Sequence, residues 1–298
     1  MPLKRQIGVK MKTIAIFYFS GTGNTEIVAD MIKEEFTWLH CQITMLRIEN
    51  VLKEKKKIDL SQYDLVGIGC PVIGYTVPDI VMKFAKLLPN NTHKKVFIFR
   101  TAGGVAPVNY NASKPLIRRL KRKNFDVFHE RIFSISSNWI YRFDNEVIKQ
   151  LYEATKRKVS LLCNQVINGE PRILKTKIHL RIKMETINLA VSKMIWLIGK
   201  DLRVHNSCTR CGLCINNCPS GNIFLKGEKI RFGHTCNSCM RCVYSCPKGA
   251  IHYRFLTFFP VKGGYNIEKI LKQPQMHDAA NTAKEPPFFR EYIANDDL

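Results

Sequence analysis

The sequence predicts a doubly wound α/β domain with a five-stranded parallel sheet, followed by a smaller α+β domain built around repeated cysteines. The first prediction rests on five short β-prone segments that alternate with segments of helical periodicity within residues 12–170. The second rests on one cysteine spacing that occurs twice within residues 207–254. The chain has 298 residues, which is enough for two such domains.

The first predicted strand is a continuous apolar run, as expected of a central strand that is buried on both faces of a parallel sheet, and four more β-prone segments follow it. The five segments are residues 13–19, 42–48, 65–70, 95–100 and 125–135. Segments with helical spacing lie between and after them, at residues 27–36, 78–88, 112–123 and 145–167. In such a sheet, ligands bind beyond the carboxyl ends of the strands, where the strand order reverses.

The turn after the first predicted strand has the composition of an anion-binding loop. It reads Ser20-Gly21-Thr22-Gly23-Asn24-Thr25-Glu26 and opens a helix. Backbone N–H groups at a helix N-terminus point at an anion, and the helix dipole favours its charge. The glycines allow close backbone approach, and the hydroxyl side chains add donors. A Rossmann loop would need glycine in place of Glu26, and a P-loop would need a Gly-Lys-Ser/Thr that is absent. An ordinary glycine-rich turn without a ligand is the alternative.

This loop resembles the S/T-x-T-G-x-T phosphate loop of the flavodoxins, with matches at Ser20, Thr22, Gly23 and Thr25. The resemblance implies an FMN site whose phosphate is held without a cationic side chain. Two further loops would flank the isoalloxazine ring, with Gly74 and Gly103 bringing backbone groups to it. Tyr75 would either stack on the ring or be a plain loop aromatic. The residues predicted to bind the cofactor are Ser20, Gly21, Thr22, Gly23, Asn24, Thr25, Pro71, Val72, Ile73, Gly74, Tyr75, Thr101, Ala102, Gly103 and Gly104.

Eight of the 11 cysteines form the pattern C-x2-C-x2-C-x3-C-P, at residues 208–219 and again at 236–247. Three thiolates at this spacing can wrap one iron–sulfur cube, and in the bacterial two-cluster pattern the fourth cysteine of each run serves the other cluster. A zinc site has no use for a third cysteine at this spacing, and a disulfide framework would need an oxidising compartment. We assign one [4Fe–4S] cluster, cluster I, to Cys208, Cys211, Cys214 and Cys246. Cluster II takes Cys236, Cys239, Cys242 and Cys218.

The repeat resembles the bacterial two-cluster ferredoxins over residues 205–254, including the Gly-Asn-Ile and Gly-Ala-Ile steps that follow its two Cys-Pro pairs. The remaining cysteines, Cys41, Cys70 and Cys163, are expected to be small buried apolar residues. As a whole, the chain resembles the fused flavodoxin–ferredoxin proteins that are often called EFR1-family ferredoxins.

The predicted organisation has five parts. They are a basic lead-in (1–11), a flavodoxin-like FMN-binding domain (12–170), a basic amphipathic connector (171–206), a 2[4Fe–4S] ferredoxin domain (207–254) and a partly irregular C-terminal tail (255–298). The connector is expected to be a helix that packs between the two domains rather than on a membrane surface. Residues 273–298 are polar and are expected to be partly disordered.

The chain has a formal net charge of +23, whereas the flavodoxins and ferredoxins that it resembles are usually acidic. A positive field speeds the encounter with acidic redox partners, although a lysine-rich solvated surface is the alternative. No recognised nucleic-acid module is present, and contact with an anionic membrane surface is not favoured. No signal peptide and no apolar run of a membrane span is visible, so we expect a reducing, anaerobic cytoplasm.

We therefore expect an electron-transfer protein that couples FMN to two [4Fe–4S] clusters and exchanges electrons between redox partner proteins. One alternative is a flavin-dependent reductase of a small acceptor or NAD(P)H. Another is a non-redox interaction or sensing module with an empty flavodoxin fold. No catalytic triad, metal–histidine site or carboxylate pair indicates a substrate pocket, so no catalytic residue is predicted, and an electron carrier is favoured over a substrate-specific enzyme.

Overall fold

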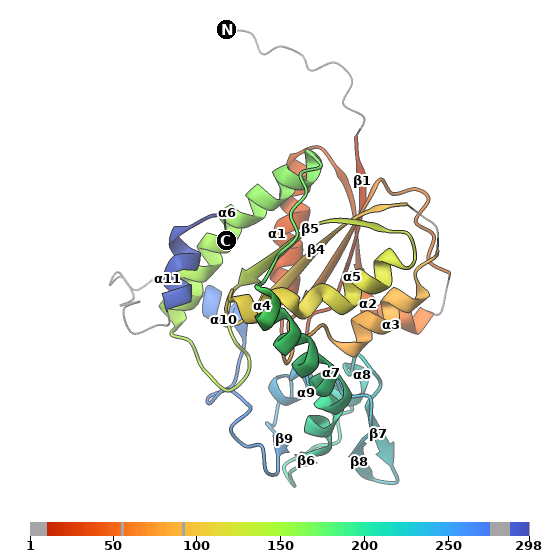
Figure 1. The fold of residues 1–298 in the computed structure, drawn as a ribbon. Helices are drawn as coiled ribbons and strands as arrows, with labels where there is room; N and C mark the ends of the chain where they lie inside the picture. The colour runs from red at the N-terminus through yellow and green to blue at the C-terminus, as the bar shows by residue number, and fades with distance from the viewer. Residues whose placement is uncertain (1–10, 55–56, 91–92, 275–286, 298) are drawn as a thin grey trace.

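The first half of the chain folds around a parallel sheet whose strand order is β2-β1-β3-β4-β5 (Figure 1). The structure is a computed structural model that describes residues 11–54, 57–90, 93–274 and 287–297. All four strand pairings are parallel, which confirms the predicted doubly wound sheet. The strands are β1 (Thr13–Tyr18), β2 (Gln42–Arg47), β3 (Leu65–Pro71), β4 (Lys95–Ala102) and β5 (Asp126–Ser134).

Helices cover both faces of this sheet. On one face, α1 (Asn24–Trp38) and α6 (Asn145–Ile167) pack on an apolar core that includes Ile16, Phe97 and Phe133. The other face is covered by α2 (Ile48–Glu54), α3 (Asp79–Leu87) and α5 (Lys114–Lys121). The predicted helix 112–123 is shorter in the structure, because residues 111–113 form a 3-10 turn that follows α4 (Pro107–Tyr110).

The cysteine-rich part lies against the carboxyl ends of the strands (Figure 1). Its elements are β6 (Leu202–Val204), α8 (Leu213–Asn216), β7 (Ile223–Lys226), β8 (Lys229–Phe232), α9 (Arg241–Tyr244) and β9 (Ile251–Tyr253). The sequence repeat is also a backbone repeat, because Gly212 and Met240, at equivalent positions, both have positive φ, 76° and 63°. β6 pairs antiparallel with β9, and β7 with β8, which gives the small α+β unit that was expected.

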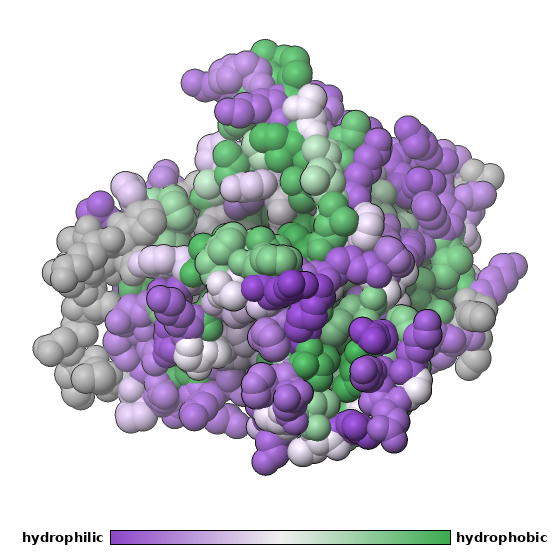
Figure 2. Space-filling view, turned by 90° about the horizontal axis from the view of Figure 1, so that it is seen from below, coloured by the Kyte–Doolittle hydropathy of each residue, from purple (hydrophilic) through white to green (hydrophobic). Residues whose placement is uncertain are grey.

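A single long helix, α7 (Ile178–Lys200), joins the two parts. It touches both of them: a Cβ on Gly74 would lie 2.5 Å from Val191, and Ser238 donates a hydrogen bond to the carbonyl oxygen of Ile195 at 2.9 Å. Viewed from the end that carries the cysteines, the surface mixes hydrophobic and hydrophilic areas (Figure 2). Among the residues that the structure describes, no helix is long and apolar enough to span a membrane. Several large apolar side chains of α7 are exposed: Ile178, Ile182, Leu189, Met194 and Leu197.

The chain returns from the cysteine-rich part to the sheet, through α10 (Ile267–Leu271) and α11 (Pro287–Ala294). The polar composition of residues 273–298 had suggested disorder, but α11 buries Phe289 and Tyr292, which are 1% and 0% exposed. Both side chains lie in the core between the sheet and α6. The C-terminal segment is therefore part of the first domain's core, which the sequence analysis missed; residues 275–286 lie outside the described part.

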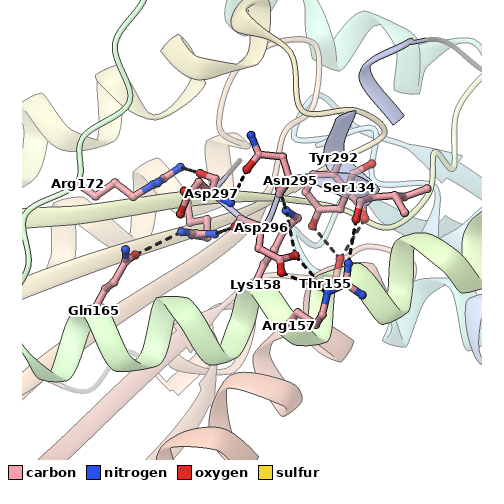
Figure 3. Close-up of polar contacts among 12 residues, drawn as sticks. Ser134, Thr155, Arg157, Lys158, Gln165, Arg172, Tyr292, Asn295, Asp296 and Asp297 are labelled. Carbon is pink, nitrogen blue, oxygen red and sulfur yellow. Dashed lines mark hydrogen bonds and ion pairs between the residues drawn. The ribbon is translucent and has the colours of Figure 1, made fainter. Parts of the chain in front are cut away.

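Polar contacts hold the end of the described chain against α6 and the strand edge (Figure 3). The hydroxyl groups of Thr155 and Tyr292 are 2.9 Å apart, and Arg172 donates to the carbonyl oxygen of Asp297 at 2.6 Å. Lys158, whose side chain is fully buried, donates to the carbonyl oxygen of Asn295. These contacts fix residues 292–297 on the domain that begins 280 positions earlier in the sequence.

Candidate functional site

The predicted phosphate loop lines a cavity at the carboxyl ends of the strands. β1 ends at Tyr18 and α1 begins at Asn24, so the loop supplies the free N–H groups of the helix start. Gly23 has a φ of 101°, a conformation that glycine adopts without strain. The Ser20 hydroxyl accepts a hydrogen bond from the Gly23 N–H at 3.2 Å, which shapes the turn. The loop has the geometry and the neutral donors of an anion site.

Segments at the carboxyl ends of β3, β4 and β5 meet the phosphate loop in this cavity, together with Cys239 of the cysteine-rich part. The hydroxyl groups of Thr25, at the start of α1, and Thr101, near the end of β4, are 2.7 Å apart, which ties these two elements together. Asn138 donates from its side chain to the Thr22 hydroxyl at 2.7 Å. The residues lining the cavity are Ser20, Gly21, Thr22, Asn24, Thr25, Pro71, Val72, Ile73, Thr101, Ala102, Gly103, Ser136, Ser137, Asn138, Trp139 and Cys239.

Sequence reasoning missed the stretch 136–139, which follows β5 and carries no motif. The only signal for it was its position, because the carboxyl ends of parallel strands share one edge of the sheet. Trp139 is the aromatic residue among the cavity's lining residues. Its indole N–H donates to the carbonyl oxygen of Ser238 at 3.2 Å, so it also contacts the cysteine-rich part.

Four of the predicted cofactor residues lie outside the lining of this cavity. Gly23 lines an adjoining hollow, and Gly74 packs against α7. Gly104 packs against Phe288, to which a Cβ on the glycine would come within 2.3 Å. Tyr75 is 45% exposed, with a φ of 62°. A role for these residues in cofactor binding stays a prediction.

The two guanidinium groups nearest the phosphate loop are paired with carboxylates. Arg47 contacts Glu26 and lies 3.4 Å from Glu49, and Arg241 lies 2.7 Å from Glu49. Burial raises the pKa of Tyr18 to about 12, so its hydroxyl stays protonated and donates to Glu26 at 3.1 Å. The charges of these two arginines are therefore balanced, and the neutral donors of the loop are left to meet an anion.

All four cysteines assigned to cluster II line one cavity: Cys218, Cys236, Cys239 and Cys242. Backbone N–H groups of Ser238 and Asn222 donate to the sulfur atoms of Cys236 and Cys218 at 3.3 and 3.2 Å. Burial raises the pKa of the Cys239 thiol to about 12, so a buried cationic iron–sulfur core is what would keep this sulfur deprotonated. The donor set fits a [4Fe–4S] cluster.

The cysteines assigned to cluster I lie nearer the surface, and Cys211 is exposed. The N–H groups of Arg210 and Ala250 donate to the sulfur atoms of Cys208 and Cys246 at 3.4 and 3.2 Å, at positions equivalent to those in cluster II. Burial raises the pKa of Cys214, and the neighbouring Cys208 and Cys246 raise it further. These three thiols, from both runs of the repeat, are therefore neighbours.

Within the described ranges, no group of three or more His, Cys, Asp or Glu side chains is placed to hold a single metal ion. Ligands of one zinc ion would have to converge at about 2.3 Å from a point, whereas a cubane cluster holds its cysteines further apart. The three cysteines outside the repeat, Cys41, Cys70 and Cys163, are buried as expected.

The loop of cluster II touches the phosphate loop directly. A Cβ on Gly21 would lie 2.4 Å from the carbonyl oxygen of Cys239. Arg241 donates to the carbonyl oxygens of Ser20 and Gly21, the latter at 3.3 Å. On the other side of the contact, Asn237 accepts a hydrogen bond from the N–H of Ile80, at the start of α3, at 3.0 Å. The two candidate sites thus share a wall.

Known families match both parts of the chain. A family model described as a flavodoxin domain matches residues 15–158, and one described as a 4Fe-4S binding domain matches residues 205–221 and 234–249. The chain is 31% identical over 93 residues to a flavodoxin of Megasphaera elsdenii, a match that covers 30% of this chain and 65% of that protein.

Solved structures match about half of the chain. Flavodoxin 2 of Bacillus cereus is 19% identical, with a TM-score of 0.40, over 52% of this chain and 98% of its own. An NAD(P)H:quinone oxidoreductase of Methanothermobacter marburgensis is 8% identical, with a TM-score of 0.41, over 53% and 96%.

Proposed function

The chain joins a flavodoxin domain on its N-terminal side to a 4Fe-4S binding domain on its C-terminal side, and from this layout we propose that it couples FMN to two [4Fe–4S] clusters. The two domains support a role in electron transfer; the flavodoxin domain implies FMN, and the 4Fe-4S binding domain implies iron–sulfur clusters. FMN holds one or two electrons, whereas a cluster passes one. The protein would therefore convert between two-electron and one-electron transfer for its redox partner proteins.

One observation carries this proposal: Cys239 lines both the cavity of the phosphate loop and the cavity of cluster II. A ligand of cluster II would therefore form part of the wall of the flavin site. This arrangement favours direct passage of electrons between the two cofactors within one chain. The FMN residues would be those of the phosphate loop and the loops that line the same cavity, and the cluster ligands would be the eight cysteines of the repeat.

The chain's own side chains would fix the positions of the two cofactors relative to each other. Arg241 lies between Cys239 and Cys242 in the sequence and donates to two carbonyl oxygens of the phosphate loop. Trp139 contributes to the flavin cavity and donates to the backbone of the cluster II loop. Backbone N–H groups aimed at the cysteine sulfurs stabilise negative charge there, which raises the potential of a cluster.

In this proposal, the cysteines of cluster II would hold the cluster that exchanges electrons with FMN, and the cysteines of cluster I would hold the one that exchanges electrons with partner proteins. The exposed Cys211 supports an outward position for cluster I. The contact of Cys239 and Trp139 with the flavin cavity supports transfer through the cluster rather than reduction of a small acceptor at that wall. The proposed setting is a reducing cytoplasm, which keeps the cysteines free to bind iron.

Anaerobic purification with quantitation of iron, sulfide and flavin tests the proposal. We expect about eight irons and one FMN per chain, the content of two cubanes and one flavodoxin site. Iron without flavin would favour an interaction module, and rapid turnover of a small acceptor without any partner protein would favour a reductase. Zinc in place of iron would contradict the proposal.

A further inference from the structure

A groove lined by basic side chains runs beside the cysteines assigned to cluster I, away from the flavin cavity. Its volume is about 630 Å³, which gives room for side chains of a partner rather than for one ion. It includes Cys208, and five cationic side chains line it against the single carboxylate of Glu228. The cationic residues are Lys200, Arg203, Arg210, Lys229 and Arg231.

Most of the positive charge in this groove faces solvent. Arg210 is paired with Glu228 at 3.2 Å, but that carboxylate is 82% exposed and offers weak neutralisation. Arg203 donates to the carbonyl oxygens of Lys200 and Leu202, both at 2.8 Å, and these neutral partners leave its charge uncompensated. Lys229 and Arg231 lie on β8, with exposed side chains. The groove is therefore a concentrated positive patch at the edge of a candidate cluster.

We propose that this groove is the docking surface through which cluster I exchanges electrons with an acidic electron-carrier protein. The inference rests on the proposed function, because it needs cluster I to be a redox centre. Three observations support it: the positive charge of the groove, the presence of Cys208 in its lining and the exposure of Cys211. Complementary charge steers such encounters and orients the partner, and a partner seated here would lie against a cluster ligand.

A nucleic acid is the other polyanion that such a groove could meet. Grooves that bind single strands add aromatic platforms on which bases stack. The lining holds two aromatic side chains, Phe232, which is half-buried, and His205, which is exposed, so it offers one small ring and no row of stacking platforms. The position beside Cys208 has no use in binding a nucleic acid, whereas it is what a redox partner needs.

The test measures electron transfer from a chemically reduced acidic two-cluster bacterial ferredoxin to the full, anaerobically purified protein, by stopped flow at several salt concentrations. The variant K229E/R231E reverses two charges in the groove. The control K33E/K156E makes the same change of net charge on α1 and α6, where both lysines are exposed. A zwitterionic viologen serves as a reductant that needs no docking surface.

We expect the groove variant to lower the second-order rate constant at low salt by at least about tenfold and to flatten its salt dependence, with less than about a threefold change in the control. The viologen should reduce all three proteins equally. An equal loss in both variants, or no loss in either, would overturn the docking surface while leaving the proposed function intact. Failure of the viologen to reduce the wild-type protein would instead contradict the proposed function. Loss of oligonucleotide binding in K229E/R231E, with unchanged transfer from the ferredoxin, would assign the groove to nucleic acid.

Discussion

Gly21 lies directly against Cys239, so closely that a Cβ on the glycine would come within 2.4 Å of the carbonyl oxygen of Cys239. Real side chains do not approach this closely, and the contact is with backbone, which has little freedom to yield. Gly21 therefore has a role at the contact between the two domains. It permits the loop of one domain to meet the cluster loop of the other.

Replacing Gly21 with alanine is expected to push the two loops apart. Overpacking of this kind costs about 1–3 kcal/mol of unfolding free energy. We expect the variant to retain its iron but to lose FMN affinity and to transfer electrons more slowly between flavin and cluster. Gly227→Ala is the control, because a Cβ there meets open space in the β7–β8 turn, although its positive φ carries a cost of about 1 kcal/mol. Equal flavin retention in the two variants would argue against the shared wall.

Arg241 is expected to position the cluster II loop on the phosphate loop. Arg241→Gln removes hydrogen bonds to Ser20, Gly21 and Glu49, and each bond from a charged donor contributes about 1.5–3 kcal/mol. We expect slower flavin-to-cluster transfer and a shifted flavin potential, with iron content unchanged. Arg254→Gln, at an exposed arginine, provides the comparison. If Arg241→Gln changes stability alone and leaves the potential and the rate as in the wild type, Arg241 has only a structural role.

Each cluster is assigned three cysteines from one run of the repeat and the fourth from the other run, and this assignment can be tested with cysteine variants. Cys218→Ser and Cys239→Ser should abolish the same EPR signal, because both would serve cluster II, and each should leave about four irons. Cys246→Ser and Cys208→Ser should abolish the other signal. If instead Cys218→Ser behaves like Cys208→Ser, each run of the repeat holds its own cluster and the assignment is wrong.

The sequence predicted the local features of this fold well. Strands buried on both faces are continuous apolar runs, so β1, β3 and β4 were found to within two residues. The cysteine repeat can be recognised from the spacing of its residues alone. By contrast, the contact of Gly21 with Cys239 depends on how two domains pack, and no local pattern encodes that. The stretch 136–139 joins the cavity through its place after β5, which topology alone reveals.

The C-terminal helix was missed for a different reason. Residues 273–298 are polar on average, and the few apolar residues that α11 buries are too sparse to outweigh them. Phe289→Ala should cost about 3–5 kcal/mol of unfolding free energy, since that side chain is 1% exposed in the core. Phe258→Ala, at a side chain that is 57% exposed, should change it by less than about 0.5 kcal/mol. Chemical unfolding of both variants checks this, and equal small effects would show that α11 does not contribute to the core.

The buried Lys158 should make stability depend on pH. Burial lowers its pKa from 10.5 to about 8, and the nearby Asp296 offsets this only in part. Between these two values the unfolded chain binds more protons than the folded one, so stability rises with pH, by up to about 1.4 kcal/mol per pH unit. The free energy of unfolding in urea should therefore rise from pH 8 to pH 9.5 by more in the wild type than in Lys158→Met. A difference between the two proteins that does not change with pH would contradict a depressed pKa.

Electron exchange between the flavin and cluster II within one chain is the step on which the proposed function depends. Flash reduction of the anaerobic protein with a one-electron donor, followed at flavin and cluster wavelengths, tests it most directly. We predict a phase of transfer between cluster and flavin whose rate does not depend on protein concentration, which persists in Cys211→Ser and disappears in Cys239→Ser. A rate proportional to protein concentration, or a phase that survives the loss of Cys239, would contradict the account.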